Sequence, residues 1–445
     1  MSNKLDSIFR DHFCINLEDT SVHFEIISRN EDEEKFLSIR KLYLDQLATH
    51  PLREQVSKKL YIDEEVIIHL LLIFPRSDVA EIKPDSFFYY PVCTIEEIKR
   101  IENPQAGDDY LLLLRANPIA DNPRIARIFF ARMENFGDDW SLTRYYEDLD
   151  FDFGKYITKL SEENALKCSS VPSGFILVRE PNGACIKSKF GKVVVVSEAM
   201  RHFLYYMNVF AHHRNFSLDF DDAVACLFIA IRTMLQTEAL DFDIDPRGDL
   251  PRDAHDYCRI VADDQLQFII GHEYAHLILG HLDPNSMVSS AADILTMSAT
   301  REFPKYYTPR QQQEFDADYG SVMHANYSDG ERVRIINAAT LFFLYLDLYY
   351  SVSDYINPSF GGPKTHPDPI ERIWTLRKSV CDNQEVESGD LFSNEDILDW
   401  IEYFGSIKAK LTNDILPYHI DDLEQYSSVY LPSRGKNPKI DRFDF

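Results

Sequence analysis

A short stretch of this chain contains H-E-x-x-H, formed by His272, Glu273 and His276. In an α-helix the two histidines are one turn apart on the same face, so both imidazoles can reach a single zinc ion. Glu273 lies beside them and can act as general base on a zinc-bound water. Apolar residues flank the motif on both sides, which predicts a buried helix over about 259–282.

Two histidines leave a catalytic zinc site one protein ligand short. The third histidine of the metzincin pattern is missing, since Leu282 occupies its position. A second helix is expected to begin after Thr308, and on it Glu314 and Asp318 are four residues apart and share a face. Glu314 can bind the metal, and Asp318 can accept the second N–H of a ligating histidine. The alternative is an amphipathic helix with two surface acids.

Three motifs follow one another between roughly residues 190 and 380. They are H-E-x-x-H-x-x-x-x-H from 272 to 281, E-F-x-A-D from 314 to 318, and T-H-P from 365 to 367, with E-R at 371–372. In this order they resemble the soluble catalytic part of HtpX-like and CAAX-prenyl-protease-like zinc peptidases, which are gluzincins.

The resemblance implies a role for six residues of these motifs. It implies zinc ligation by His272, His276 and Glu314, base catalysis by Glu273, and orientation of a ligating histidine by Asp318. It also places His366 near the metal, where it would stabilise the oxyanion of the tetrahedral intermediate. Tyr319 is a weaker candidate for that donor, and spacing alone fits His366 equally well to a turn beside Pro367.

Composition limits the class of protein. The 445 residues have a formal net charge of −27, which disfavours binding to nucleic acid or to an anionic membrane. Seven scattered cysteines without a C-x-x-C pair indicate reduced thiols, and no apolar run reaches the roughly 18 residues of a membrane helix. We therefore expect a cytoplasmic protein without a membrane segment, and no prenylated or membrane-bound substrate. The oligomeric state is left open.

The expected fold is α+β and mainly helical, with a zincin-like catalytic domain and an added N-terminal region. Residues 1–160 form a mixed α/β region of unknown role, 161–385 the catalytic domain, and 386–445 a helical C-terminal tail. A turn at 181–183 between two apolar runs predicts a small antiparallel sheet.

The second of these runs contains Val193, Val194, Val195 and Val196. It could be an exposed edge strand that binds a peptide substrate by β-addition, or an ordinary core strand, which this apolar pattern favours.

Three other segments are ambiguous. Residues 63–74 have helical spacing, whereas the apolar runs at 111–114 and 125–131 fit either a strand or a buried helix. Alternating aspartates at 241–249 resemble a calcium-binding loop, but Pro246 stands where an EF-hand has its turn glycine. An ordinary acidic loop is therefore favoured.

The motifs predict a zinc-dependent endopeptidase with one zinc ion per chain and a restricted intracellular protein or peptide substrate, in a regulatory, stress-related or defensive role. One alternative is a non-catalytic metal-binding sensor or interaction protein on the same scaffold, although the presence of Glu273 speaks against it. Another is a metal-dependent hydrolase of a non-peptide substrate, which H-E-x-x-H alone does not exclude.

Overall fold

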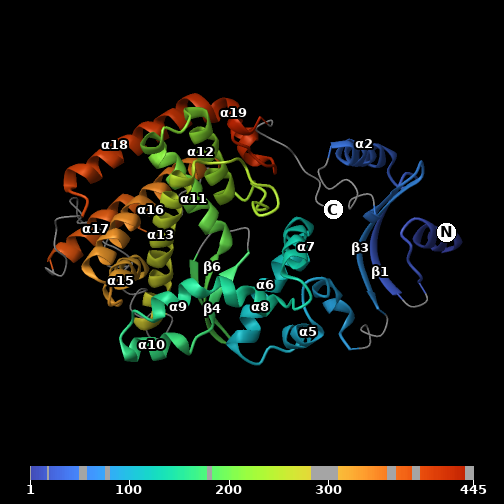
Figure 1. The fold of residues 1–445 in the computed structure, drawn as a ribbon, viewed down its shortest axis with the longest axis horizontal. Coiled ribbons are helices and arrows are strands. Elements are labelled where there is room, and N and C mark those ends of the chain that lie inside the picture. The colour runs from blue at the N-terminus through green and yellow to red at the C-terminus, as the bar shows by residue number, and fades with distance from the viewer. Residues whose placement is uncertain are drawn as a thin grey trace, which may run out of the picture. The chain divides into compact units, whose positions relative to one another are not determined.

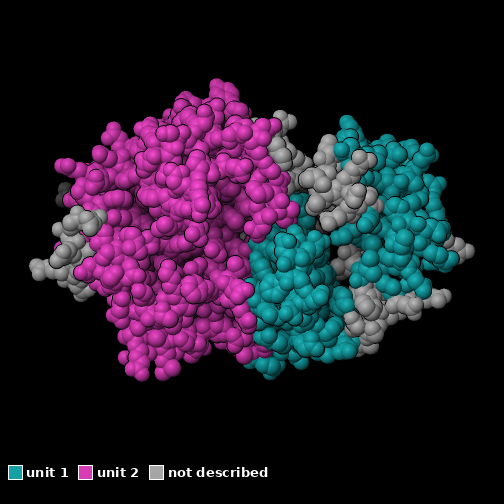
Figure 2. Space-filling model, in the orientation of Figure 1, with its two compact units in different colours: residues 1–105, 112–145, 440–445 teal, residues 106–111, 146–439 magenta. Residues whose placement is uncertain are grey.

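The computed structural model describes residues 2–17, 20–49, 58–75, 81–177, 183–281, 309–357, 367–382 and 391–435. The chain forms two compact units, one of residues 1–105, 112–145 and 440–445, the other of 106–111 and 146–439 (Figure 2). The fold is α+β and mainly helical, as expected from the sequence.

The first unit contains a three-stranded antiparallel sheet in the order β1-β3-β2, formed by Thr20–Ser28, Val66–Pro75 and Leu60–Ile62. Helices α1 (Ser2–Asp11) and α2 (Glu33–Thr49) pack against β3 through alternate residues. Ile68 packs in one hydrophobic core cluster with Phe9 of α1, and Ile67 packs in a second hydrophobic core cluster with Phe36 of α2. The helical interpretation of 63–74 is thus wrong, because residues 67–70 of β3 are buried on both faces and the sequence of the strand shows no polar alternation.

The rest of this unit is helical. Its elements are η1 (Pro84–Tyr89), α5 (Ile95–Glu102), most of α6 (Gly107–Asp121), α7 (Pro123–Phe136) and the start of α8 (Leu142–Leu149). The apolar runs at 111–114 and 125–131 therefore lie in helices. Thr94 caps α5 in a capping box with Glu97, whose carboxylate also accepts the backbone N–H groups of Leu142 and Thr143.

The second unit contains a small mixed sheet in the order β4-β6-β5. Central β6 (Gly191–Ser197) pairs with β4 (Ser173–Ile176) in parallel and with β5 (Gly183–Ser188) in antiparallel orientation. The two predicted apolar runs form β4 and β6, which pair in parallel, and the antiparallel partner of β6 is β5, which begins at the last residue of the predicted turn.

The helices of the second unit pack around α13 (Arg252–Ile278), which Figure 1 shows in their midst. Helix α13 contacts α11 (Glu198–His212), α15 (Pro309–Met323), α16 (Asp329–Ile356) and the short helices α9 (Phe151–Ile157) and α10 (Glu162–Ser169). Further elements are η2 (His213–Phe216), α12 (Phe220–Met234), α17 (Pro369–Asp382), α18 (Asn394–Lys410) and α19 (Leu416–Glu424).

These contacts place the unit boundaries elsewhere than expected. Helices α9 and α10 pack on α13, so the second unit begins near residue 146 and not near 160. Helix α18 packs on α16, and α19 on α12, so the described part of the predicted C-terminal tail belongs to the same unit.

Helix α16 is the one described helix that is long and apolar enough to cross a membrane. Within the second unit, however, 72 % of its most apolar window is buried. Its side chains include the fully buried Phe343 and Tyr345, and Tyr345 donates a hydrogen bond to Asn208 of α11 at 2.8 Å. In this fold α16 serves as a core helix.

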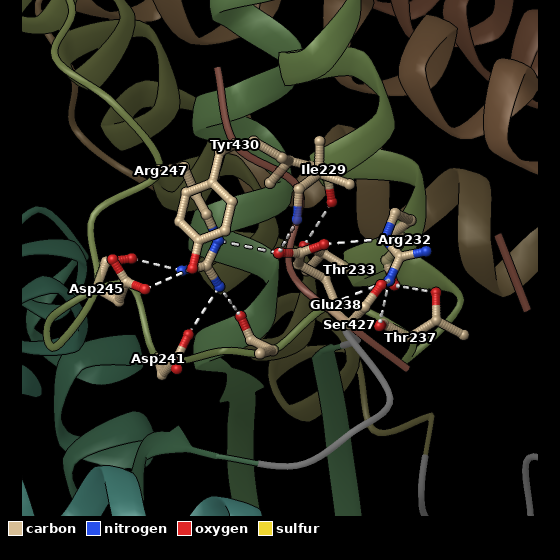
Figure 3. Close-up of polar contacts among 12 residues, drawn as sticks. Ile229, Arg232, Thr233, Thr237, Glu238, Asp241, Asp245, Arg247, Ser427 and Tyr430 are labelled. Atoms are coloured by element: carbon tan, nitrogen blue, oxygen red, sulfur yellow. Dashed lines mark hydrogen bonds and ion pairs between the residues drawn. The ribbon is translucent and has the colours of Figure 1, made fainter. Parts of the chain in front are cut away.

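A buried ionic network joins α12 to the C-terminal segment (Figure 3). Glu238 accepts hydrogen bonds at 3.0 Å from Arg232 and from Arg247, and all three side chains are completely buried. Arg247 also pairs with Asp241 at 2.8 Å. The acidic loop at 241–249 thus has two buried aspartates, Asp241 and Asp245, which pair with Arg247 and Arg434, whereas Asp243 and Asp249 are exposed.

Candidate metal centre

Helices α13 and α15 cross at very short range where they carry the motif residues. An ideal Cβ placed on Gly271 of α13 would lie 2.9 Å from the carbonyl oxygen of Ser321 on α15. On the other side of the crossing, a Cβ on Gly320 would lie 3.0 Å from Cβ of Ala275. Small residues on both helices thus allow the approach that brings His272 and His276 to Glu314.

The ligand atoms of His272, His276 and Glu314 all lie within 4.8 Å of one another. The two Nε2 atoms are 3.1 Å apart, and the carboxylate oxygens of Glu314 lie 3.5 Å from Nε2 of His272 and 3.6 Å from Nε2 of His276. Tetrahedral zinc with ligands at about 2.0–2.1 Å separates its donor atoms by about 3.3 Å. The three side chains therefore fit zinc in donor type and in spacing.

Asp318 fixes the orientation of His272. Nδ1 of His272 donates to Oδ1 of Asp318 at 2.9 Å, which leaves Nε2 facing the other two ligands. Burial would raise the pKa of Asp318, but Arg372 and His272 outweigh it and hold this pKa below its usual value. A permanently ionised acceptor keeps the imidazole in the tautomer that a metal needs.

His281 plays the same part for His276. Gly280 ends α13 with φ of +74°, and the N–H of His281 then bonds to the carbonyl of His276 at 3.0 Å. With the N–H of Gly280 on the carbonyl of Leu277, this is a Schellman motif, and it turns the chain back over the helix. The two Nδ1 atoms of His281 and His276 lie 2.8 Å apart, so a hydrogen bond between them leaves Nε2 of His276 for the metal.

The proton affinities of the two histidines differ strongly. Burial lowers the pKa of His272, but hydrogen bonds to Asp318 and Glu314 outweigh it and raise this pKa to about 10. Burial together with nearby His272 lowers the pKa of His276 to about 3. A proton on His272 therefore competes with a metal for the space between the two Nε2 atoms.

Glu273 is buried between α13 and β5. It is 7 % exposed, and a Cβ placed on Gly183, the first residue of β5, would lie only 2.7 Å from Oε1 of Glu273. Cys185 on the same strand also feels this carboxylate, since burial first and then Glu273 raise the pKa of its thiol to about 12. The candidate base therefore faces β5, one of the two edge strands of the described sheet.

One of the predicted features does not join this group, and another lies outside the described residues. Val193 to Val196 lie in β6, with residues 194–196 paired on both sides, so the prediction of an exposed edge strand there is wrong. The four valines are buried, as in an ordinary core strand. Thr365 and His366 lie outside the described residues, so the role of His366 stays a prediction, and Tyr319 is half-buried on α15.

Three residues of the site had no role assigned from the sequence. Arg372 and His281 were only members of the quoted motifs, and Gly183 was part of a turn signal. Gly280, just before His281, is the one local signal that could have predicted the end of the helix there and the contact of His281 with His276.

No family model, curated protein or solved structure matches this chain. The resemblance to gluzincins accordingly remains an interpretation of the three motifs. The case for a metal comes from the donor set of His272, His276 and Glu314 and from their spacing.

Proposed function

We propose that this protein is a zinc-dependent endopeptidase that hydrolyses peptide bonds of a restricted protein substrate. The observation that carries the proposal is the grouping of three zinc-type donors beside a buried glutamate. His272, His276 and Glu314 would hold one zinc ion, and Glu273 follows the first ligand on the same helix. Asp318 orients His272 from the adjacent helix.

A zinc ion held by these three ligands would supply a bound water of lowered pKa and would polarise the substrate carbonyl. The carboxylate of Glu273 would take the water proton and pass it to the leaving amide nitrogen. Burial keeps this carboxylate away from bulk solvent, which strengthens its interaction with the reacting atoms. We propose His366 as the donor that stabilises the oxyanion.

The edge strand β5 is our candidate for the substrate-binding strand, in place of Val193–Val196. Its partner β6 occupies one side, and its first residue, Gly183, touches Glu273. An extended peptide that adds to the other side of β5 would run past the base. This arrangement supports hydrolysis of an extended polypeptide segment over hydrolysis of a small non-peptide molecule.

The first test is the metal content of the purified protein. We expect about one zinc per chain in the wild type, and loss of most of it in His272→Ala and in Glu314→Gln. A wild type that binds no zinc even when zinc is supplied would overturn the proposal. Zinc retained by Glu314→Gln would remove Glu314 from the ligand set.

The second test separates an enzyme from a metal-binding sensor. The zinc-loaded wild type is incubated with a proteome-derived peptide library and new termini are identified by mass spectrometry, with Glu273→Gln as the matched control. We expect cleavage by the wild type alone, at equal zinc content. Cleavage that persists unchanged in Glu273→Gln would exclude the proposed mechanism.

A further inference from the structure

A pocket of about 360 Å³ lies outside the metal centre, between the end of α11 with η2 and one face of α18. Its wall on the α11 side contains His212 and Arg214. Its wall on α18 contains Asp396, Asp399, Trp400 and Tyr403. The volume lies within the range of about 300–1,000 Å³ that is usual for small-molecule sites.

Local sequence makes both walls rigid. Residues 396, 399, 400 and 403 have the i, i+3, i+4, i+7 spacing of one helix face, and Ser393 starts α18 with a capping box. On the other side, α11 continues into η2, which ends at Ser217 in the left-handed conformation. Trp400 stacks on Phe404 with ring centroids 5.9 Å apart, and this contact holds its indole in place.

His212 provides a buried polar atom without a described partner. His212 is only 7 % exposed, and no described residue forms a hydrogen bond with its Nε2. The rings of Tyr257 and Trp400 meet the imidazole edge-on at 5.1 and 5.8 Å. Burial lowers the pKa of His212 to about 4, so a neutral ring lines the pocket at pH 7. Nε2 itself is enclosed by protein atoms, so His212 contributes an uncharged ring to the lining and no hydrogen bond to a ligand.

The charged residues of the lining have opposite signs. Asp399 and Arg214 are both exposed, and neither forms an ion pair with a residue in the described part of the chain. A ligand with only a negative charge would face the two aspartates, and one with only a positive charge would face Arg214. A ligand with both charges satisfies the two walls together.

We propose that this pocket binds a small zwitterion of amino-acid type. Its ammonium group lies at Asp396 and Asp399, and its carboxylate at Arg214. Its side chain packs against the rings of Trp400 and Tyr403, next to the neutral imidazole of His212. This binding site is independent of the metal centre and of the proposed peptidase activity.

The test is isothermal titration of the full chain with each of the twenty standard amino acids at millimolar concentration. We expect at least one of them to bind with a stoichiometry of one. Its Nα-acetyl derivative, which lacks the ammonium charge, and its amide, which lacks the carboxylate, should each bind at least tenfold more weakly. Absence of binding by all twenty amino acids would overturn the proposal.

Variants locate the binding to this pocket. Asp399→Asn and Arg214→Gln change exposed side chains, so both proteins should fold, and each should bind the same amino acid at least tenfold more weakly. Glu402→Gln, an exposed change on α18 away from the lining, is the matched control and should bind as the wild type does. Equal affinity in all three variants would place the amino acid elsewhere, including on a bound metal, and would refute the pocket.

Discussion

Arg372 of α17 donates two hydrogen bonds to Asp318 of α15, from Nε to Oδ2 at 2.8 Å and from Nη2 to Oδ1 at 2.5 Å. The guanidinium lies over the ring of Phe343, 4.6 Å from its centroid, and is almost completely buried. Since the same Oδ1 of Asp318 accepts the hydrogen bond from His272, a third helix determines how the first candidate ligand is held. Arg372 is thus a positioning residue.

We predict that Arg372→Gln weakens zinc binding by about tenfold to a hundredfold, because Asp318 loses the cation that keeps it ionised and oriented. Arg372→Lys should restore part of the affinity, since it keeps the charge but not the two-pronged geometry. Competition with a chromogenic chelator measures the effect. Lys378→Gln, an exposed change on the same helix, is the control. An unchanged zinc affinity in Arg372→Gln would contradict the role of this arginine.

The close crossing of α13 and α15 predicts that a methyl group at Gly271 lowers the free energy of unfolding. A methyl group at Gly154, which is not at the crossing, serves as the comparison and should raise it. A Cβ on Gly271 would lie 2.7 Å from the ring of Tyr156, whose hydroxyl is itself tied to the carbonyl of Ser321. Gly271→Ala should therefore lower the free energy of unfolding by about 1–3 kcal/mol. Gly154→Ala in α9 meets nothing within 4 Å and should raise it by about 0.5–1 kcal/mol. Denaturant unfolding measures both, and changes of the same sign would argue against so close a crossing.

The contact between Gly183 and Glu273 can be tested separately from metal binding. A methyl group at position 183 would collide with the carboxylate of Glu273 and displace it. We expect Gly183→Ala to bind zinc as the wild type does, but to cleave a substrate peptide at least tenfold more slowly. A variant with full activity would show that Glu273 does not act from its position against β5.

Much of this site could be predicted from sequence because its residues are local to two helices. The i, i+4 spacing of His272 and His276, and that of Glu314 and Asp318, needs only helical geometry. The contact of Asp318 with Arg372 could not be predicted in the same way, since it joins residues 54 positions apart on different helices. The position of Gly183 against Glu273 likewise depends on how β5 packs on α13.

The strand β3 shows a second limit of prediction. Its apolar residues face α1 on one side and α2 on the other, so neither face is polar and the period of two disappears from the sequence. An apolar run of that length fits a helix equally well. The sequence also did not predict that β5 lies at the edge of its sheet and β6 at the centre, because the order in which strands pair is set by tertiary contacts.

The ionic network around Glu238 predicts a large loss of stability when this one carboxylate is replaced by an amide. In Glu238→Gln the two buried arginines lose the carboxylate that they share, which should cost about 3–5 kcal/mol of unfolding free energy. The exposed pair of Arg252 and Asp256, 3.7 Å apart, is the comparison, and Asp256→Asn should cost less than about 1 kcal/mol. Thermal unfolding of both variants measures the difference, and similar losses would contradict the importance of burial.

The buried His212 predicts a loss of stability in mild acid. Its pKa is about 4 in the folded chain and about 6.5 when unfolded, so the unfolded state binds the proton first as the pH falls. The contribution is fully present above pH 6.5 and is lost towards pH 4. Between pH 7.5 and pH 5 the wild type should lose about 2 kcal/mol more than His212→Asn does. Urea unfolding at the two pH values measures this, and parallel losses would refute it.

The ionic network also determines which part of the second unit can fold last during translation. Arg232 of α12 donates to the backbone carbonyls of Asp422, Gln425 and Ser427, which are 190 to 195 positions further along the chain. On a ribosome, the helices with the candidate metal ligands emerge well before those carbonyls do. A nascent chain can therefore assemble its ligand group while Arg232 still lacks these three acceptors, whereas the acceptors of Arg247 lie within residues 238–245. The second unit becomes fully cooperative only after residues 422–427 have left the ribosome.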